Sequence, residues 1–543
     1  MPGTAELVAI FREIADLLDL QGVRFKPEAY RRAARSLEAV TEDLGQISAR
    51  GELRSIPGVG DAIAEKITEY LRTGTVPYLD RVRGEVPPGL LEIMRLPGFG
   101  PKTARRLWVE LGVEGPRELE TALAAHRLDG LAGFGPKKIA LLAAALARAG
   151  GTPMRRPLAA AWEIAESLLA ALRAGAPVDR VEVAGSLRRR RETVGDLDIL
   201  ATSTAPERVF EVFSALPQIR TVRMRGPTKE TVELADGLQV DLRVVEPAAF
   251  GAALQYFTGS KDHNVHLRSL ARERGLKVNE YGVFRGEERV AGATEAEVYA
   301  ALGLTEIPPE IREDRGEIEA AAAGRLPPLI DGPDIRGLLH VHLDRLGGAA
   351  GLADAARAAR RLGWDYLGIV VAEESGGASV PSLPTGGPKV FVGVETTRVP
   401  SGRPPGGDYW VLRPAEGIVA PTATGAAGAT GPLLIAHLPA SVDAGFEPGQ
   451  LRPWLALATD RPIAFEVTAG AGEDGLDSTV ARQAVQAGAA LAVGPGDVAA
   501  TEWERFRLAV GLARRAGAGP SNVLNARPVT DLARSWAGRR RTG

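Results

Sequence analysis

The chain has 543 residues, too many for one hydrophobic core, so the sequence predicts three or four domains. Its hydrophobic fraction of 45% and charged fraction of 25% are ordinary for a globular protein. No apolar run is long enough for a membrane span. The absence of cysteine excludes disulfides and thiolate zinc sites. A formal net charge of −2 confines any polynucleotide contact to local basic patches.

The first third of the chain repeats one pattern at 56–64, 96–104 and 131–139, where two closely spaced glycines precede a helical run. Glycine allows positive φ and close backbone approach, so the hairpin N–H groups and the following helix N-terminus can meet phosphate oxygens. The pattern resembles the helix-hairpin-helix motif, which holds the DNA backbone without reading its sequence. One copy would fit a plain helical turn equally well, but three copies favour DNA binding. The expected contacts are Gly58, Gly60, Gly98, Gly100, Lys102, Gly133, Gly135, Lys137 and Lys138.

The stretch 185–198, GSLRRRRETVGDLD, contains a Gly-Ser turn, a run of arginines and two carboxylates one residue apart. Alternate strand residues share a face, so Asp196 and Asp198 project together and can hold divalent cations through oxygen ligands. The turn at Gly185 and Ser186 offers N–H groups and a hydroxyl to phosphate oxygens. An isolated Asp-x-Asp is common at solvated strand ends, but the preceding turn and arginines favour nucleotidyl transfer.

A third carboxylate is expected from the alternating, β-branched run 239–245. Asp241 lies mid-strand, where burial is costly unless the carboxylate is paired or metal-bound. Three carboxylates around two cations, Mg²⁺ or Mn²⁺, give a two-metal arrangement. One ion lowers the pKa of an attacking 3′-hydroxyl, and the other neutralises the triphosphate and the leaving pyrophosphate. The predicted catalytic and metal-binding residues are therefore Asp196, Asp198 and Asp241.

With these motifs in view, the chain resembles the X-family DNA polymerases of bacterial type over essentially its whole length. The resemblance rests on 185–198, on Asp241 as third metal ligand, on 255–260 (QYFTGS), on 261–268 (KDHNVHLR) and on 276–284. It implies that the triphosphate is contacted by Gly185, Ser186, Arg189 and Gly195. The sugar would be contacted by Tyr256, Phe257 and Gly259, and the base by Asn264. It also implies that Arg268 contacts the template strand.

Some X-family members remove a 5′-deoxyribose phosphate through a Schiff-base lysine. Lys66 falls at that motif position, and Lys26 and Tyr30 match residues that line the 5′-phosphate pocket. Ala62 departs from the pattern, since a lysine usually helps to hold phosphate there. The glutamates near Lys66 do not supply the cationic surroundings that lower a lysine pKa. The sequence therefore favours an ordinary lysine on a DNA-binding helix over a lyase.

The last third alternates strands and helices after a segment rich in alanine, proline and glycine, which indicates an α/β barrel. It resembles the polymerase-and-histidinol-phosphatase (PHP) domain, a distorted barrel with a trinuclear metal centre. Matching metal-ligand positions are occupied by His340, His342, Glu395 and His437. However, Leu338, Val371 and Ala372 stand where an active domain has ligands, and 491–498 has no histidine. Four ligands cannot close a trinuclear site, so we expect a degenerate domain without nuclease or phosphoesterase activity.

The sequence thus predicts a multidomain α+β protein with six segments. These are a helical lyase-like domain at 1–80, helix-hairpin-helix fingers at 81–151, a nucleotidyltransferase palm at 152–245, a thumb at 246–320, a linker at 321–335 and a PHP-like domain at 336–543. We expect a monomeric, cytoplasmic, nucleoid-associated polymerase that adds dNTPs to primers at short gaps, on gapped or primer–template DNA. The alternatives are a template-independent or end-joining polymerase, disfavoured by the short loop at 235–237, and a non-catalytic repair scaffold, disfavoured by the three aspartates.

Overall fold

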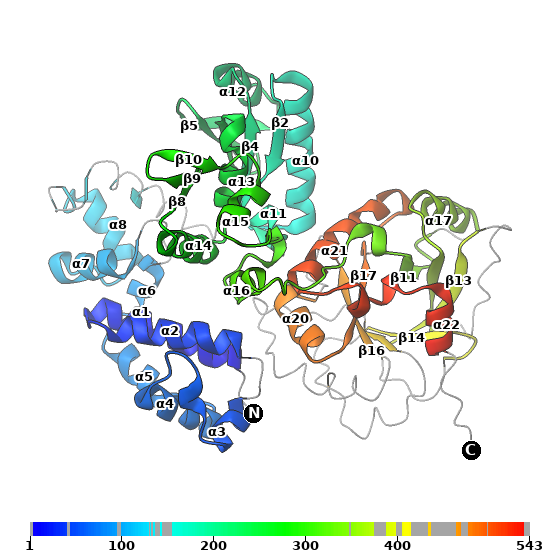
Figure 1. Cartoon of the computed structure of the whole chain (residues 1–543), viewed down its shortest axis with the longest axis horizontal. Coiled ribbons are helices and arrows are strands. Elements are labelled where there is room, and N and C mark those ends of the chain that lie inside the picture. Colours follow the sequence, from blue (N-terminus) through cyan, green and yellow to red (C-terminus); the bar gives the residue numbers. More distant parts are fainter. Residues whose placement is uncertain are drawn as a thin grey trace. The chain divides into compact units, whose positions relative to one another are not determined.

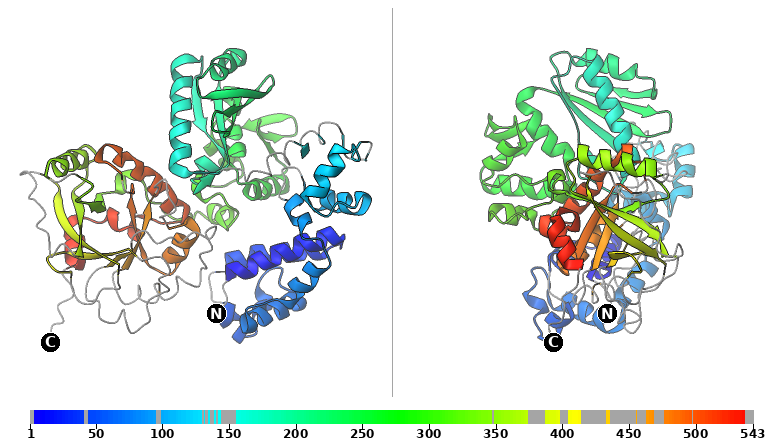
Figure 2. Two further views of the ribbon diagram at one scale, coloured as in Figure 1. Left: turned by 180° about the vertical axis from the view of Figure 1, so that it is seen from behind. Right: turned by 90° about the vertical axis from the view of Figure 1, so that its right-hand side faces the viewer.

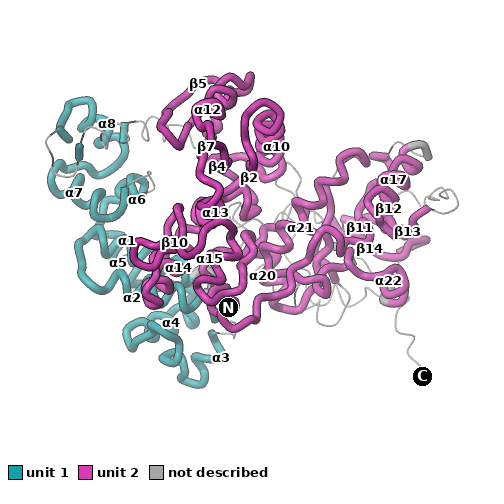
Figure 3. Tube along the Cα trace, turned by 45° about the horizontal axis from the view of Figure 1, so that its top comes forward, with its two compact units in different colours: residues 1–154 teal, residues 155–543 magenta. Residues whose placement is uncertain are grey.

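The computed structural model describes residues 4–40, 44–94, 99–129, 155–346, 349–373, 387–397, 404–413, 463–468, 476–496 and 498–536, together with the short pieces 131, 134–135, 139, 142–143, 433–435 and 455. The chain forms two compact units, residues 1–154 and 155–543 (Figure 3). No described helix is both long enough and apolar enough to cross a membrane.

The described part of the first unit is helical. Its two longest helices, α1 (Thr4–Gln21) and α2 (Lys26–Ala39), pack through apolar side chains at helical spacing, and the rings of Phe11 and Tyr30 meet edge to face at 5.5 Å. The remaining helices are α3 (Leu44–Ala49), α4 (Asp61–Thr73), α5 (Pro77–Gly84), α6 (Gly89–Met94), α7 (Pro101–Leu111) and α8 (Pro116–Ala124). Three of them begin with proline, which suits a first helical position because its missing N–H would have no partner there.

The second unit begins with a five-stranded sheet in the order β2-β4-β7-β6-β5. The strands are β2 (Arg180–Val183), β4 (Asp196–Thr202), β7 (Gln239–Val245), β6 (Lys229–Leu234) and β5 (Ile219–Arg225). Strands β4 and β7 are parallel, and the other neighbours are antiparallel. Helices α10 (Leu158–Gly175) and α12 (Pro206–Ser214) pack on one face of this sheet (Figure 1).

Alternation along β4 decides which face carries the carboxylates. Leu197 and Ile199 are buried against α10 and α12. Leu200 packs instead with α13 (Phe250–Thr258) on the opposite face. Because side chains alternate along a strand, Asp196 and Asp198 lie on the same face as Leu200. The carboxylates are therefore placed on the side of the sheet where α13 lies.

Residues 246–322 continue from this sheet as helices around a small antiparallel sheet. The helices are α13, α14 (Lys261–Glu273), α15 (Glu295–Ala301) and α16 (Glu317–Ala322), and the strands are β8 (Lys277–Asn279), β9 (Gly282–Arg285) and β10 (Glu288–Ala291). Helix α13 approaches the start of α15 closely at Gly251, where an added Cβ would lie 2.1 Å from the Thr294 carbonyl carbon. Glycine is needed there for close packing.

The C-terminal region, residues 336–543, contains a seven-stranded parallel sheet in sequential order (Figures 1 and 2). Its strands are β11 (Gly337–His342), β12 (Tyr366–Ala372), β13 (Lys389–Thr396), β14 (Tyr409–Leu412), β15 (Leu433–Ile435), β16 (Ile463–Thr468) and β17 (Ala490–Gly494). Strands β12, β14 and β16 are almost continuously buried, as is typical of parallel strands covered on both faces. The described helices are α17 (Ala349–Arg361), α20 (Ser478–Gln486), α21 (Phe506–Arg515) and α22 (Val529–Trp536).

One side chain bridges the two edge strands of this sheet. The fully buried Asn525 donates from Nδ2 to the Gly337 carbonyl of β11 at 2.8 Å and to the Val493 carbonyl of β17 at 3.0 Å. Its Oδ1 accepts from the Val493 N–H at 2.8 Å. The amide thus satisfies backbone groups that a neighbouring strand would otherwise pair.

The segment 321–335, predicted to be a linker, packs against the C-terminal region. Ile330 is fully buried, and its N–H donates to the Ala518 carbonyl at 2.8 Å.

Candidate active site

The three palm aspartates meet on adjacent strands. In the parallel β4–β7 register, Asp198 lies directly beside Asp241, and Asp196 precedes Asp198 by two residues on the same face. The structure therefore brings together the three carboxylates that the sequence singled out.

Burial and mutual repulsion raise the pKa values of two of these carboxylates. Burial, followed by the charges of Asp196 and Asp241, raises the pKa of Asp198 from 3.8 to about 7. Partial burial and then the Asp241 carboxylate also raise the pKa of Asp196. Like charges held close together disfavour ionisation unless a cation offsets them. Oxygen ligands with an excess of negative charge fit hard divalent cations such as Mg²⁺.

Asp241 has protein partners that the sequence analysis missed. Lys229 Nζ lies 2.6 Å from Asp241 Oδ2, and the Thr231 hydroxyl donates to Oδ1 at 2.7 Å. Both partners come from β6, which is antiparallel to β7 and places Thr231 opposite Asp241. The short turn at 235–237 could have indicated these partners, because it joins β6 to β7 as a hairpin. Pairing the two strands around that turn sets the register that places Thr231 opposite Asp241.

The Gly-Ser segment begins a short helix rather than an open turn, which corrects the sequence interpretation. Helix α11 (Gly185–Arg188) starts at Gly185 with φ of +61°. A Cβ at Gly185 would lie only 2.3 Å from Asp198 Oδ2. Glycine is required here both for the backbone conformation and for the approach of the carboxylate. Ser186 is half-buried beside it, and Gly195, just before β4, lies against the Arg155 guanidinium.

The arginines after the Gly-Ser segment are held by ion pairs. Arg188 donates to Glu295 Oε1 at 2.9 Å and to the Thr258 hydroxyl at 2.7 Å. Arg189 donates from Nε to Glu313 Oε1 at 3.1 Å and from Nη1 to the Thr258 carbonyl. The triphosphate contact predicted for Arg189 therefore competes with a buried ion pair to Glu313. These partners lie 69 to 124 residues away in sequence, beyond the reach of a local pattern.

The predicted sugar- and base-contacting residues lie at the end of α13 and in α14. Tyr256 and Phe257 are half-buried, with their rings 5.1 Å apart edge to face. Gly259 has φ of +74°, so a side chain there would be strained. Asn264 donates to the Tyr256 carbonyl at 2.7 Å, and the exposed Arg268 donates from Nε to the Asn264 carbonyl at 3.1 Å. The amide that was expected to meet the base is thus engaged within the protein.

The three hairpins share one hydrogen-bond pattern in their described parts. The carbonyl of the second glycine accepts from the N–H four residues later in each copy, at 2.9 Å for Gly60, 3.1 Å for Gly100 and 3.1 Å for Gly135. Gly58 has φ of +82°, and Lys102 is exposed in the first turn of α7. The remaining expected contacts lie outside the described residues, namely Gly98, Gly133, Lys137 and Lys138.

Two of the three residues matched to a lyase pocket, Tyr30 and Lys66, contact the ring of Tyr78. Tyr30 stacks on Tyr78 at 6.1 Å, and Lys66 Nζ lies 4.8 Å from the centre of the same ring. The Arg81 guanidinium lies 4.7 Å from it as well. Lys66 also donates to the Ala62 carbonyl at 3.0 Å, and Lys26 is exposed at the start of α2. Neither Tyr78 nor Arg81 was identified from the sequence.

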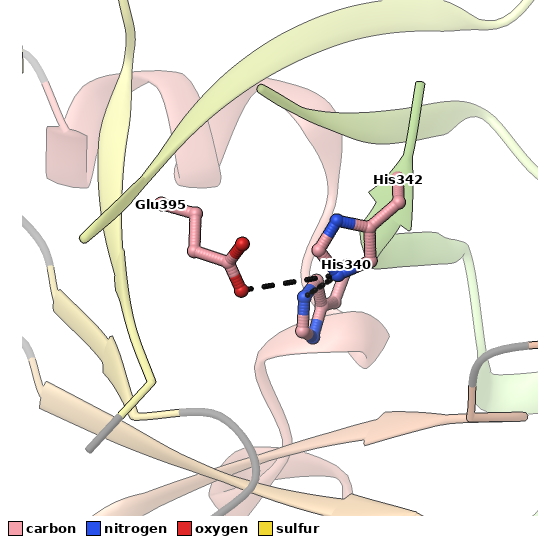
Figure 4. A group of neighbouring side chains, drawn as sticks. All are labelled: His340, His342 and Glu395. Carbon is pink, nitrogen blue, oxygen red and sulfur yellow. Dashed lines mark hydrogen bonds and ion pairs between the residues drawn. The ribbon is translucent and has the colours of Figure 1, made fainter. Parts of the chain in front are cut away.

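Three of the four predicted PHP ligands converge in the C-terminal region, and Figure 4 shows their side chains facing one another. His340, His342 and Glu395 have ligand atoms within 4.8 Å of one another. Among the described residues, no other three His, Asp or Glu side chains have their ligand atoms within this distance of one another. The carboxylate oxygens of the three palm aspartates are therefore spaced more widely than the ligand atoms of this cluster. The fourth expected ligand, His437, lies outside the described residues.

Two charged residues contact this cluster and were missed from the sequence. Glu466 Oε2 lies 2.8 Å from His340 Nδ1, and Arg413 Nε lies 3.1 Å from Glu395 Oε1. A lone glutamate in the apolar run of β16 was the available signal for Glu466. The Arg413 guanidinium supplies a positive charge at the carboxylate that a metal ion would need.

Comparison with known proteins adds independent information. The family model described as DNA polymerase beta thumb matches residues 253–313, and a helix-hairpin-helix domain model matches residues 2–76. The protein named DNA polymerase/3'-5' exonuclease PolX from Bacillus subtilis is 37% identical over 369 residues, which cover 67% of this chain and 64% of that protein. DNA polymerase lambda from Rattus norvegicus is 29% identical over 326 residues, covering 54% of this chain and 53% of its own length.

A viral relative is shorter. The protein named Repair DNA polymerase X from African swine fever virus is 28% identical over 132 residues, which cover 22% of this chain and 74% of that protein. The chain spans less than two thirds of the length of the Bacillus and rat relatives. The thumb model covers most of α13 and all of α14, where the predicted sugar and base contacts lie, and each of these relatives is named as a DNA polymerase. The chain therefore belongs to the X family of DNA polymerases.

Proposed function

We propose that the chain is a DNA-directed DNA polymerase that fills short gaps during repair, by nucleotidyl transfer from dNTPs to a primer 3′-hydroxyl. The observation that carries this proposal is the register of β4 and β7, which sets Asp198 beside Asp241 with Asp196 on the same face. The names of the relatives, which are all DNA polymerases, support the same activity.

Asp196, Asp198 and Asp241 would hold two divalent cations, Mg²⁺ or Mn²⁺, which supply a lowered hydroxyl pKa and neutralise phosphate charge when bound. The protein's own contribution is mostly positioning and charge stabilisation. The Gly185 backbone lies against the Asp198 carboxylate, so the phosphate-facing segment and the carboxylate are fixed together. Lys229 holds Asp241, the carboxylate that we assign nearest to the primer 3′-hydroxyl.

The nucleotide is assigned to the surface between α11 and the end of α13. Ser186 and Gly195 would contact the triphosphate, together with Arg189 once its ion pair with Glu313 opens. Tyr256, Phe257 and Gly259 would lie against the sugar. Asn264 would turn from the Tyr256 carbonyl to the base.

DNA is assigned to the hairpins of the first unit. Gly60 and Gly100 directly precede α4 and α7, and the positive N-terminal ends of these helices suit phosphate oxygens. Lys102 adds a positive charge in the first turn of α7. Such contacts hold the backbone without reading bases, as gap filling at any sequence requires.

The C-terminal region is proposed to be a PHP-like barrel without hydrolytic activity. Leu338 is fully buried in the main hydrophobic cluster, and Val371 is nearly so, where active domains have ligands. An apolar side chain cannot coordinate a metal, and it removes negative charge that would offset the cations. Arg413 already faces Glu395, so the remaining cluster has a protein cation beside it.

Primer extension on gapped, primer–template and single-stranded DNA, with Mg²⁺ or Mn²⁺, tests this function. We expect incorporation that depends on the template and is fastest at short gaps. Asp198→Ala and Asp241→Ala should abolish incorporation while DNA binding survives, because different residues hold the DNA. Glu182→Gln, which changes an exposed carboxylate on β2, is the matched control and should retain full activity. Retention of more than about 5% activity in Asp198→Ala would contradict the two-metal assignment.

The competing end-joining or template-independent polymerase predicts efficient extension of single strands in the same assay. The non-catalytic scaffold predicts binding to gapped DNA without incorporation by the unmodified protein.

A further inference from the structure

The C-terminal region contacts the segment that leads into the palm carboxylates. We call residues 189–192, which join α11 to β3 (Thr193–Val194) and β4, the connecting segment. Three of its four residues meet helices α20 and α21. At Gly511 of α21 an added Cβ would lie 2.7 Å from Arg190 Cγ. The Ser478 N–H at the start of α20 donates to Glu192 Oε1 at 2.9 Å.

Arg515, at the end of α21, is the centre of this contact. Its side chain is only 4% exposed, and Nη1 donates to Glu313 Oε1 at 2.7 Å and to the Arg189 carbonyl at 3.4 Å. Glu313 Oε1 also accepts from Arg189 Nε at 3.1 Å. One carboxylate therefore joins the C-terminal region to the arginine that the proposed function assigns to the triphosphate.

This carboxylate stays ionised. Burial opposes its charge, but the Arg515 and Arg189 guanidinium groups outweigh it and lower the pKa of Glu313 to about 2. A buried ion pair is costly to break from one side, because the remaining charge is left without compensation.

The connecting segment is short, so its position affects two parts of the active site. Asp196 follows Glu192 by only four residues. In the other direction, Arg189 donates from Nη1 to the Thr258 carbonyl, directly before Gly259 of the proposed sugar contact. A displacement of 1 Å at reacting groups can cost about a hundredfold in rate, even when its origin is remote.

We propose that Arg515 is a positioning residue for nucleotidyl transfer, and that the C-terminal region holds the connecting segment in place through Arg515, Glu313 and Ser478. The inference rests on the proposed polymerase function and adds to it a role for the C-terminal region. That region then acts on the palm through contacts, not through chemistry of its own.

Steady-state incorporation by the full chain on gapped DNA gives the first test. Arg515→Ala should raise the KM for dNTP about tenfold, with the Kd for DNA changed less than about twofold. Arg515→Lys should recover part of this loss, because it restores a buried positive charge. The matched control is Arg514→Ala. Arg514 is adjacent on α21, yet it pairs with Glu310 at 2.8 Å and donates to the Ile330 carbonyl at 2.9 Å. The Arg514→Ala substitution should therefore change the KM for dNTP less than about twofold.

Hydrogen–deuterium exchange of the free full chain gives a second test that needs neither DNA nor nucleotide. Amides 189–198 should exchange about tenfold faster in Arg515→Ala and at the unmodified rate in Arg514→Ala. Should Arg515→Ala fail to fold, Glu192→Gln removes the charge at the Ser478 contact with little change of volume and should move the same amides in the same direction.

The two tests separate the inference from the proposed function. Equal KM changes in the Arg515 and Arg514 variants, or unchanged exchange at 189–198, would overturn the positioning role. If the unmodified chain does not incorporate nucleotide, the proposed function fails and the positioning role in catalysis fails with it. Faster exchange would then support only a structural contact between the C-terminal region and the connecting segment.

Discussion

Replacing Asp198 by asparagine should stabilise the metal-free protein while it destroys incorporation. The folded chain holds this carboxyl with a pKa of about 7, against an ordinary value of 3.8. At 1.36 kcal/mol per pKa unit the ionised group costs the fold up to about 4 kcal/mol above pH 7. Asp198 is half-buried, so solvent screening reduces this to about 2–4 kcal/mol. In a unit of this size that corresponds to about 2–4 °C in the unfolding midpoint.

The sign of the pH dependence follows from the raised pKa. Between pH 3.8 and 7 the folded carboxyl is protonated while the unfolded one is ionised, so rising pH favours unfolding. The advantage of Asp198→Asn is therefore full above pH 7 and declines as the pH falls towards 3.8. At pH 5 less than about half of it should remain. Saturating Mg²⁺ should stabilise the unmodified protein more than the variant, because the ion binds the folded carboxylates.

Thermal unfolding in EDTA and in Mg²⁺, at pH 5 and pH 8, measures these differences. Glu182→Gln is the control, since it removes one exposed charge from the neighbouring strand β2 and should leave the midpoint unchanged. A lower midpoint for Asp198→Asn than for the unmodified protein at pH 8 in EDTA would refute the reasoning. It would mean that the fold stabilises the Asp198 charge without a cation.

Three further predictions concern the other assigned regions. Lys102→Ala should lower the slope of log Kd against log salt for gapped DNA by about one, and Lys389→Ala, an exposed lysine of the C-terminal region, should not. Borohydride trapping on a 5′-deoxyribose-phosphate substrate should give no adduct, because Lys66 is bonded to a backbone carbonyl and lies over Tyr78; an adduct lost in Lys66→Arg would reverse this assignment. The full chain carrying Asp198→Asn should show no 3′→5′ nuclease activity in Mn²⁺, and a metal-dependent activity abolished by His340→Ala would restore the C-terminal region as an enzyme.

The sequence predicted the site best where the relevant feature depends on a single strand or a single turn. The alternation in 196–202 and 239–245 places three carboxylates on one face, since the period of a strand is a local property. The hairpin glycines are equally local, because positive φ at Gly58 follows from the turn itself. These elements needed no knowledge of distant residues.

The partners of those carboxylates and arginines were not predictable in the same way. Arg189 meets Glu313 across 124 residues, and Arg515 meets Glu313 across 202. Nothing in the pattern around an arginine states which distant glutamate it will pair with. Even the Gly-Ser segment, which the sequence predicts to be a turn, begins α11 and lies against the Asp198 carboxylate, a close approach that the local residues do not reveal.

The two charged centres of the second unit differ in what balances them. In the palm, Asp196 and Asp198 have raised pKa values even though the charges of Arg155, Arg243 and Lys229 lower them, so these protein cations do not fully offset burial and mutual repulsion. In the C-terminal region, Glu395 is met by Arg413, and Leu338 contributes apolar burial where the family resemblance implies a ligand. Carboxylates whose pKa values stay raised beside protein cations would gain from a bound divalent cation, whereas the Glu395 carboxylate already has the Arg413 guanidinium as a partner. This difference supports the proposal that the palm carries the chemistry, and the positioning role proposed for the C-terminal region rests separately on the contacts of Arg515 with Glu313 and the Arg189 carbonyl.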